Sequence, residues 1–369
     1  MKKYIYFIGI DISKETLDMS VISNGDVLTH SLIPNEQKAI KSHIIQLRRS
    51  LGFTKRNAIF GMENTGIYSN HLINTLESLK LDTVVEQPLH IKNSLGVVRG
   101  KTDKLDSKRI AMYLYKSRDV LRLRDPKRPI LEQLANLTSL RKRLQSLHIA
   151  MKTPLKESAG FVKKGLIEQS NRLCSRSIDA LTLDIKDVED SIEATWKSDE
   201  DLNRLMTLVQ SVPCIGPSIA LEMIICTNEF KNIPTIKQFA SYAGIAPFPY
   251  KSGTSIQKKT RVSRIANKKM KALLHTSAVL ARRFVPDIKD YYHRKTVIEG
   301  KHKMLVLNAI RFKMASRVYA CLKNNKPYQK DFKFNPPLKY RLIEIEDKRF
   351  VTSQWSNRLA DLKYLVKKV

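Results

Sequence analysis

Three short apolar runs at the start of the chain constrain its fold more than any other feature. They span residues 4–10, Leu17–Ile22 and Val27–Leu32, and an Asn24–Gly25 pair separates the last two. Short runs rich in Ile, Val and aromatic residues are typical of β-strands, and Asn-Gly favours a tight hairpin turn. These residues therefore predict a three-stranded meander.

The segments that follow alternate between helical and strand patterns. We expect, in this order, a helix near 36–50, a strand at Ala58–Met62, a helix from about Gly66, a strand at Thr83–Glu86 and a helix near 103–116. The resulting order, βββαβαβα, is that of an α/β ribonuclease H-like (RuvC-like) domain. We expect this domain to occupy residues 1–126 and to end near Pro126.

Long helices are predicted for residues 127–200. Apolar residues recur there at alternating steps of three and four, in one series from Leu137 to Met151 and another from Leu181 to Ile192, with a break around Pro154 and Gly160. This spacing is typical of helices that pack along one stripe. The two helices can form a hairpin within one chain or a coiled coil between chains, so the segment is a helical spacer or an oligomerisation arm.

A mainly helical domain is expected for residues 201–330, followed by a basic C-terminal tail at 331–369. The turn Val212–Gly216 has the pattern of a helix-hairpin-helix, in which backbone N–H groups face a phosphate. A plain turn between two helices would use the same residues. Lys301–Leu322 predicts an amphipathic basic helix.

The charge of the chain indicates a polyanionic partner. Lys and Arg number 66 against 35 Asp and Glu, which gives a net charge of +31 and argues against an ordinary metabolic enzyme. The stretch Phe230–Pro286 contains no acidic residue at all, so contact with backbone phosphates is the better explanation for its cations. No apolar run is long enough to span a membrane, and four scattered cysteines fit a reduced cytoplasmic protein.

Four acidic residues are placed where such a fold could use them. Asp11 and Glu63 each end an apolar strand, and Asp103 and Asp106 share one face of a predicted helix. A ribonuclease H-like topology brings these elements to one edge of the sheet, where four carboxylates can hold two Mg²⁺ ions about 3.5–4 Å apart. Taken singly, each acid also fits a turn, a helix cap or a solvated surface.

Several motifs along the chain resemble those of the DEDD-type insertion-sequence transposases. They are GIDISK, GMENTGIY, VRGKTDKLDSKR, VPCIGPSIA and YAGIAPFPYKSGTS, and they follow the family order over nearly the whole chain. Members of this family are bridge-RNA-guided recombinases with an N-terminal RuvC-like domain and a C-terminal transposase domain. The sequence departs from the family pattern at Lys104, where Arg is frequent, and at Ser107, where Ala is common.

The resemblance implies roles for individual residues. Asp11, Glu63, Asp103 and Asp106 match the catalytic quartet that binds Mg²⁺, with Mn²⁺ as an alternative ion. The serine nucleophile of the family falls at Ser252, with Ser255 as the second candidate. From the residues alone, this Ser-Gly-Thr-Ser segment is a flexible turn that could also bind phosphate or simply face solvent.

The resemblance also implies the partners: donor and target DNA, a structured noncoding bridge RNA, and further copies of the chain in a dimer or tetramer on the nucleoid. The residues that we expect to contact nucleic acid are basic, and they are Arg99, Lys101, Lys251, Lys258, Lys259, Arg261, Arg264, Lys268, Lys269 and Lys271. The expected function is RNA-guided DNA recombination through a covalent phosphoserine. The alternatives are a metal-dependent junction endonuclease that uses water and a nucleic-acid-binding protein without catalysis.

Overall fold

The computed structural model describes residues 4–96, 100, 102–253, 256–330, 340–344 and 364–368. The chain forms two compact units, Met1–Pro129 and Ile130–Val369. The end of the first unit lies close to Pro126, where the sequence predicts the end of the ribonuclease H-like domain.

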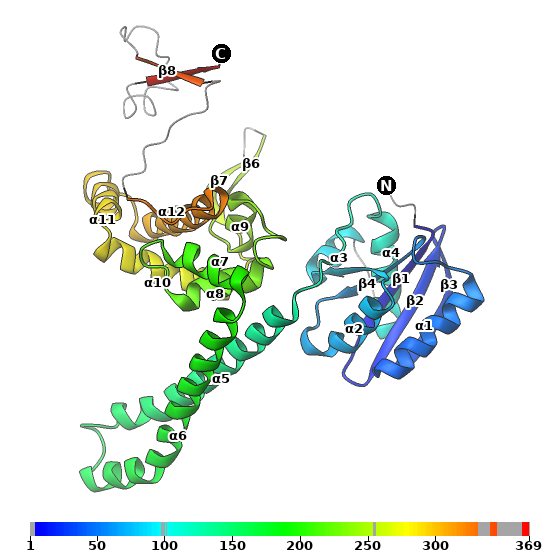
Figure 1. The fold of residues 1–369 in the computed structure, drawn as a ribbon, viewed down its shortest axis with the longest axis horizontal. Coiled ribbons are helices and arrows are strands. Elements are labelled where there is room, and N and C mark those ends of the chain that lie inside the picture. Colours follow the sequence, from blue (N-terminus) through cyan, green and yellow to red (C-terminus); the bar gives the residue numbers. More distant parts are fainter. Residues whose placement is uncertain are drawn as a thin grey trace. The chain divides into compact units, whose positions relative to one another are not determined.

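The first unit is built around a five-stranded mixed sheet (Figure 1). Its elements are β1 (Tyr6–Ile12), β2 (Thr16–Ser23), β3 (Asp26–Pro34), α1 (Gln37–Leu51), β4 (Ala58–Glu63), the 3₁₀-helix η1 (Gly66–Ser69), α2 (Asn70–Ser78), β5 (Asp82–Glu86), α3 (Pro88–Ser94) and α4 (Asp103–Lys116). The strands lie in the order β3-β2-β1-β4-β5. The first three pair antiparallel, whereas β4 and β5 run parallel to β1. This is the predicted ribonuclease H-like arrangement, which is therefore confirmed.

Alternation along the strands divides the core of this unit into two layers. Ile8 and Ile10 of β1 are buried in the apolar cluster that contains residues of α1 and α2. Phe7, of the opposite parity, belongs instead to the cluster that contains Ala111 and Leu114 of α4. Because successive side chains of a strand point to opposite faces, Asp11 faces the same side as Phe7, which is the side covered by α4.

Glycine allows α4 to pack directly on the backbone of β1. A Cβ atom at Gly9 would lie 2.1 Å from the Ala111 nitrogen and 2.3 Å from the Ser107 carbonyl oxygen. Beside this contact, the buried hydroxyls of Ser20 and Ser107 form a 2.8 Å hydrogen bond between β2 and α4. No side chain could be inserted here without moving the helix.

Two long helices open the second unit. They are α5 (Pro129–Glu157) and α6 (Lys164–Lys197), which run antiparallel beside each other (Figure 1). An ion pair between Arg141 and Glu189 (3.9 Å) connects them, as does a 3.4 Å hydrogen bond between His148 and Thr182. The helices thus form a hairpin within one chain, and a coiled coil between chains stays a prediction. The predicted break between the helices is present and contains Gly160, but it does not begin at Pro154, because α5 continues to Glu157 and the chain turns at 158–163.

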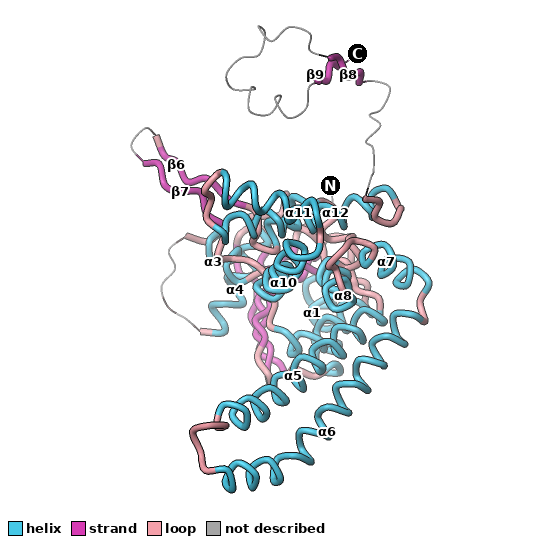
Figure 2. Tube along the Cα trace, turned by 90° about the vertical axis from the view of Figure 1, so that its left-hand side faces the viewer, coloured by secondary structure: helices cyan, strands magenta, loops and turns pink. Residues whose placement is uncertain are grey.

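The rest of the second unit is a helical domain with a protruding β-hairpin (Figure 2). Its elements are α7 (Glu200–Gln210), α8 (Pro217–Thr227), α9 (Ile236–Tyr242), β6 (Pro247–Ser252), β7 (Ile256–Val262), α10 (Lys268–Phe284), α11 (Pro286–His293), the π-helix η2 (Arg294–Ile298), α12 (Lys303–Asn324), β8 (Tyr340–Glu344) and β9 (Tyr364–Lys368). One apolar core joins residues from α5 through α12. The predicted basic helix at Lys301–Leu322 is confirmed as α12.

The turn between α7 and α8 contains the predicted helix-hairpin-helix motif. Cys214 has a left-handed φ of 64°, and Gly216 precedes Pro217 at the first position of α8. Two helices do meet at this turn, but a phosphate-binding role for it stays a prediction. No helix among the described residues is long and apolar enough to cross a membrane.

The contact between β1 and α4 leads to a first prediction. Gly9→Ala should lower the free energy of unfolding of the first unit by about 1–3 kcal/mol, because the added methyl group overlaps helix backbone that cannot give way without shifting α4. Urea unfolding followed by circular dichroism would measure it. Gly165→Ala in α6 is the control, since a Cβ there meets no atom within 4 Å. Equal stability of Gly9→Ala and the wild type would contradict the close packing.

Candidate active site

The four predicted acids come from three elements of the first unit that approach the same edge of the sheet. Asp11 is near the end of β1 and Glu63 is the last residue of β4. Ile10 pairs with Met62 between these parallel strands, so the two acids follow at neighbouring positions. Asp103 and Asp106 lie in the first turn of α4, which begins where the Thr102 hydroxyl accepts a hydrogen bond from the Leu105 N–H (3.2 Å).

Electrostatics shows that these carboxylates share one site. Burial, followed by the charges of Asp103, Asp106 and Glu63, raises the pKa of Asp11 from its usual 3.8 to about 6. The Ile12 N–H donates to Asp11 Oδ1 at 3.1 Å and opposes this shift. Asp11 therefore lies close enough to the other three acids for their charges to disfavour its ionisation.

Arg109 neutralises part of this cluster, and the sequence analysis did not select it. Its Nη1 donates to Asp106 Oδ1 at 2.5 Å, while its Nη2 donates to the Gly100 carbonyl oxygen at 2.7 Å. One guanidinium thus connects a catalytic candidate with the loop before α4. Arg109 follows Asp106 by three residues on the same predicted helix, and this spacing is the sequence feature that could have identified the pair.

Two further acids extend the array across the sheet. Asp18 of β2 pairs directly with Asp11, and Glu86 of β5 pairs with Glu63. Each outer acid is held by neighbours: Asp18 bonds His30 Nε2 at 2.8 Å, and Glu86 accepts from the Tyr113 hydroxyl at 2.8 Å. Four adjacent strands therefore each carry a carboxylate at this level.

The serine candidate belongs to the second unit. Ser252 is the exposed last residue of β6 and pairs with Ile256 of β7. Gly253 follows with a left-handed φ of 55°, and an added Cβ there would meet no atom within 4 Å. The strand thus ends in an uncrowded turn that presents the Ser252 hydroxyl to solvent. Ser255 lies outside the described residues.

The predicted nucleic-acid contacts have varied surroundings. Arg261, Arg264, Lys268 and Lys271 line one cavity at the base of the β6–β7 hairpin, and Lys251 is exposed on β6. Lys269 instead forms a 2.5 Å ion pair with Glu222 of α8. The side chains of Lys258 and Lys259 in β7 are not among those described, and Arg99 and Lys101 lie outside the described residues.

Comparison with known proteins assigns both units. A sequence profile of the DEDD transposases of the IS110 type matches residues 8–157, and one described as Transposase IS116/IS110/IS902 family matches residues 206–293. The chain belongs to the IS110/IS116 family of transposases. All four acids fall within the first match, and Ser252 falls within the second.

Several individual proteins resemble this transposase. The pilin gene-inverting protein of Moraxella lacunata is 26% identical over 88% of this chain and 98% of its own length, and that of Moraxella bovis is 25% identical over the same shares. An uncharacterized 43.6 kDa protein of insertion element IS110 from Streptomyces coelicolor is 27% identical over 38% of this chain and 34% of its own. Among solved structures, T. thermophilus RuvC in complex with a Holliday junction substrate aligns with a TM-score of 0.27 and 9% identity, over 33% of this chain and all of RuvC.

The acids of this transposase have the chemistry of a divalent-metal site. Carboxylate oxygens are the ligands that Mg²⁺ and Mn²⁺ prefer, and a bound cation would relieve the repulsion that raises the pKa of Asp11. Within the described part of the chain, no three His, Cys, Asp or Glu residues lie close enough together to enclose an ion. The four carboxylates therefore have the chemistry that a divalent metal requires. In the structure they are spaced as separate groups, and one of them, Asp106, is bound to Arg109.

The raised pKa of Asp11 predicts how stability depends on pH. The folded-state pKa of about 6 exceeds the usual 3.8, so ionisation of Asp11 progressively destabilises the fold as the pH rises through this interval. Asn resembles the protonated acid. Asp11→Asn should therefore unfold at higher urea than the wild type above pH 6 without divalent ions, and the gain should disappear towards pH 4.

The control for this titration is Asp26→Asn, because Asp26 is exposed at the start of β3. Its unfolding midpoint should follow that of the wild type at each pH. A lower stability of Asp11→Asn than of the wild type at pH 8 would show that Asp11 is not repelled by its neighbours.

Proposed function

We propose that this transposase is an RNA-guided site-specific recombinase that excises and integrates an insertion sequence. The observation that carries the proposal is the convergence of Asp11, Glu63, Asp103 and Asp106, whose charges act together on one carboxyl. A cluster of like charges at the ends of two strands and the start of a helix destabilises the fold. A role in binding cations for DNA chemistry therefore explains the cluster better than a structural role does.

Ser252 is the proposed nucleophile. Its Oγ loses a proton and forms an ester bond with the DNA phosphorus, while the bond from phosphorus to a sugar oxygen breaks and that oxygen leaves as a hydroxyl. A hydroxyl of the partner DNA strand then attacks the phosphorus of this ester. The new bond from phosphorus to that sugar oxygen replaces the bond to Ser252 Oγ, which takes back a proton. One phosphodiester replaces another, so no external energy source is needed.

The carboxylates would hold Mg²⁺ or Mn²⁺, which when bound supplies positive charge to the phosphate oxygens. In the protein itself, Arg109 keeps Asp106 and the loop at Gly100 in register with the acids. The four acids belong to one unit and Ser252 to the other, so the reaction requires both units at the same phosphate, either from one chain or from two.

The relatives favour strand exchange over simple cleavage. Inverting a pilin gene requires DNA strands to be cut and rejoined, and the proteins named for this activity align over 98% of their length. An exchange of this kind involves four strands, which supports a dimer or tetramer. Base pairing by a bridge RNA would choose the donor and target, while the excess of 31 positive charges neutralises nucleic-acid backbones.

The acid site is tested by single conservative changes. Asp11→Asn and Asp106→Asn should each abolish strand cleavage with Mg²⁺, because each removes a charged ligand, while DNA and RNA binding remains near that of the wild type. Cleavage of labelled donor DNA and gel-shift binding would be measured side by side, with Asp26→Asn as the control. Cleavage at the wild-type rate by both variants would refute the assignment of the acids.

The serine is tested by trapping the covalent intermediate. Labelled donor DNA incubated with wild type and Mg²⁺ should yield, after denaturation, a shifted band that protease removes, and Ser252→Ala should abolish both this band and recombination. An adduct that persists in Ser252→Ala but disappears in Ser255→Ala would transfer the role to Ser255. If the wild type cleaves DNA without forming any adduct, water is the nucleophile and the protein is an endonuclease.

A further inference from the structure

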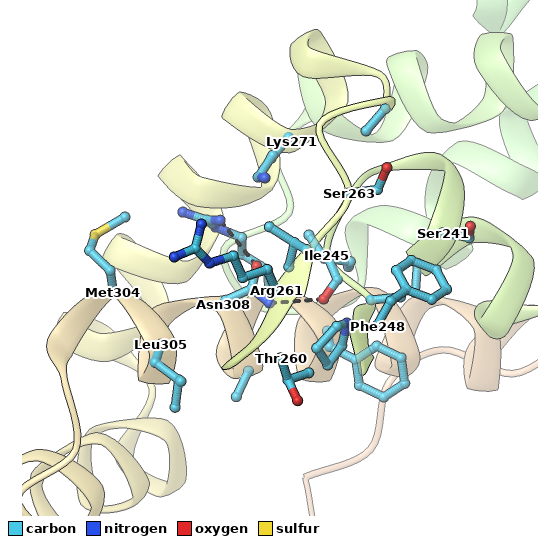
Figure 3. Close-up of a pocket in the computed structure, with 18 of the residues that line it drawn as sticks. Ser241, Ile245, Phe248, Thr260, Arg261, Ser263, Lys271, Met304, Leu305 and Asn308 are labelled. Atoms are coloured by element: carbon cyan, nitrogen blue, oxygen red, sulfur yellow. Dashed lines mark hydrogen bonds between the residues drawn. The ribbon is translucent and has the colours of Figure 1, made fainter. Parts of the chain in front are cut away.

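A large cavity opens at the base of the β6–β7 hairpin in the second unit (Figure 3). Its volume is about 1540 Å³, and its walls come from α9, both strands of the hairpin, α10 and α12. This exceeds the roughly 300–1,000 Å³ of typical small-molecule pockets, so the space suits a segment of a polymer.

Positive charge surrounds this cavity. Seven basic residues line it, and none of the described lining residues is acidic; the seven are Lys237, Arg261, Arg264, Lys268, Lys271, Arg311 and Lys313. Three of them, Lys237, Arg311 and Lys313, lie outside the set that the sequence analysis selected. An anionic ligand would be drawn into such a space.

Arg311 is the strongest indication of an anion-binding position. Its side chain is buried, at 6% exposure, and its guanidinium donates to Asn308 Oδ1 at 3.2 Å and to His275 Nδ1 at 2.7 Å. Both acceptors are neutral, and no carboxylate among the described residues lies within ion-pair distance of Arg311. A buried cation without a counter-ion is costly unless a ligand supplies the negative charge.

The groups beside Arg311 respond to the same uncompensated charge. Burial, and then the Arg311 guanidinium, lower the pKa of Lys271 and also that of His275. A phosphate at this position would relieve the repulsion between Lys271 and Arg311. His275 stays neutral, because its Nδ1 must accept the hydrogen bond from Arg311.

Several of the other lining groups are large, apolar and partly exposed to solvent. Phe248 of β6 is 47% exposed and Phe312 of α12 is 39% exposed, while Met304 and Leu305 lie along the start of α12 (Figure 3). Aromatic rings next to phosphate-binding cations are the combination that binds unpaired nucleotides, since each base can stack on a ring while its backbone contacts the cations. In a duplex the base faces are covered by their neighbours.

We infer that this cavity binds a single-stranded nucleic-acid segment, with a backbone phosphate at Arg311 and Lys271 and unstacked bases against Phe248 and Phe312. The inference rests on the proposed function, which supplies strands that are unpaired during exchange or guide pairing. Phe248 lies four residues before Ser252 on β6, or about 13 Å along the strand. A strand held here is therefore within a few nucleotides of the proposed nucleophile.

Binding of short fluorescein-labelled probes to the full chain in EDTA tests the inference. The probes are oligothymidylate, oligouridylate and a DNA duplex, followed by fluorescence anisotropy. Phe248→Ala and Phe312→Ala should each weaken binding of the preferred single strand by about fivefold or more, because each removes a stacking platform, with little change for the duplex. Phe284→Ala, which removes an exposed ring of α10 outside the cavity, is the matched control and should bind all three probes as the wild type does.

The phosphate contact has its own readout. Lys271→Met should reduce the slope of log affinity against log salt for the single strand by about 0.7, as expected for one lost contact. Lys323→Met, an exposed lysine at the end of α12 outside the cavity, should leave the slope unchanged.

Each outcome supports or overturns the site. Selective loss for oligothymidylate or oligouridylate supports it and identifies the strand as DNA or RNA. Unchanged binding by both Phe variants, or equal losses for single strand and duplex, would overturn it. Because the assay contains no divalent ion and no cleavage step, its result is independent of whether Asp11 and Ser252 have their proposed roles.

Discussion

The contact of α4 with the backbone of β1 fixes the position of half of the acid cluster. Gly9 provides the space, and the hydrogen bond between Ser20 and Ser107 holds the helix at that height on the sheet. Asp103 and Asp106 lie one turn or less from this contact, at the start of the same helix. A residue larger than glycine at position 9 would displace the helix that carries both carboxylates.

The fold also compensates for the repulsion that this packing creates. The positive end of the α4 dipole lies at the first turn, where both helix acids are found, and Arg109 adds a full charge next to Asp106. At Asp11, burial and the charges of the neighbouring acids raise the pKa, and the N–H of Ile12 opposes this rise.

Much of the first unit could be predicted because its signals are local. Strand alternation, the Asn24–Gly25 turn and the order of elements were sufficient to place Asp11 and Glu63 at one edge of the sheet. The Asp18–His30 pair depends on the register between β2 and β3, and the Glu86–Tyr113 bond depends on where α4 lies against the sheet. The sequence displays neither. The break between α5 and α6 falls at Gly160, whereas Pro154 stays inside α5, because proline near the exposed end of a long helix removes few hydrogen bonds that the fold needs.

The second unit was harder to predict, because the roles of its charged residues depend on tertiary contacts. Arg311 resembles any other cation of a basic helix until packing of α12 against α10 buries it beside His275 and Lys271. Lys269 belongs to the same acid-free stretch of sequence, yet Glu222 from outside that stretch neutralises it. Counting charges along the chain could not separate these two cases.

The placement of Ser252 at the open end of a hairpin has a bearing on genome safety. A hydroxyl in free solvent, with no acid or base of its own unit bonded to it among the described contacts, is chemically no more reactive than the water around it. In the proposed mechanism the carboxylates of the other unit do not cut DNA without this serine. Neither half cuts host DNA by itself in this mechanism, so damage is confined to assemblies in which both halves have been recruited to one phosphate.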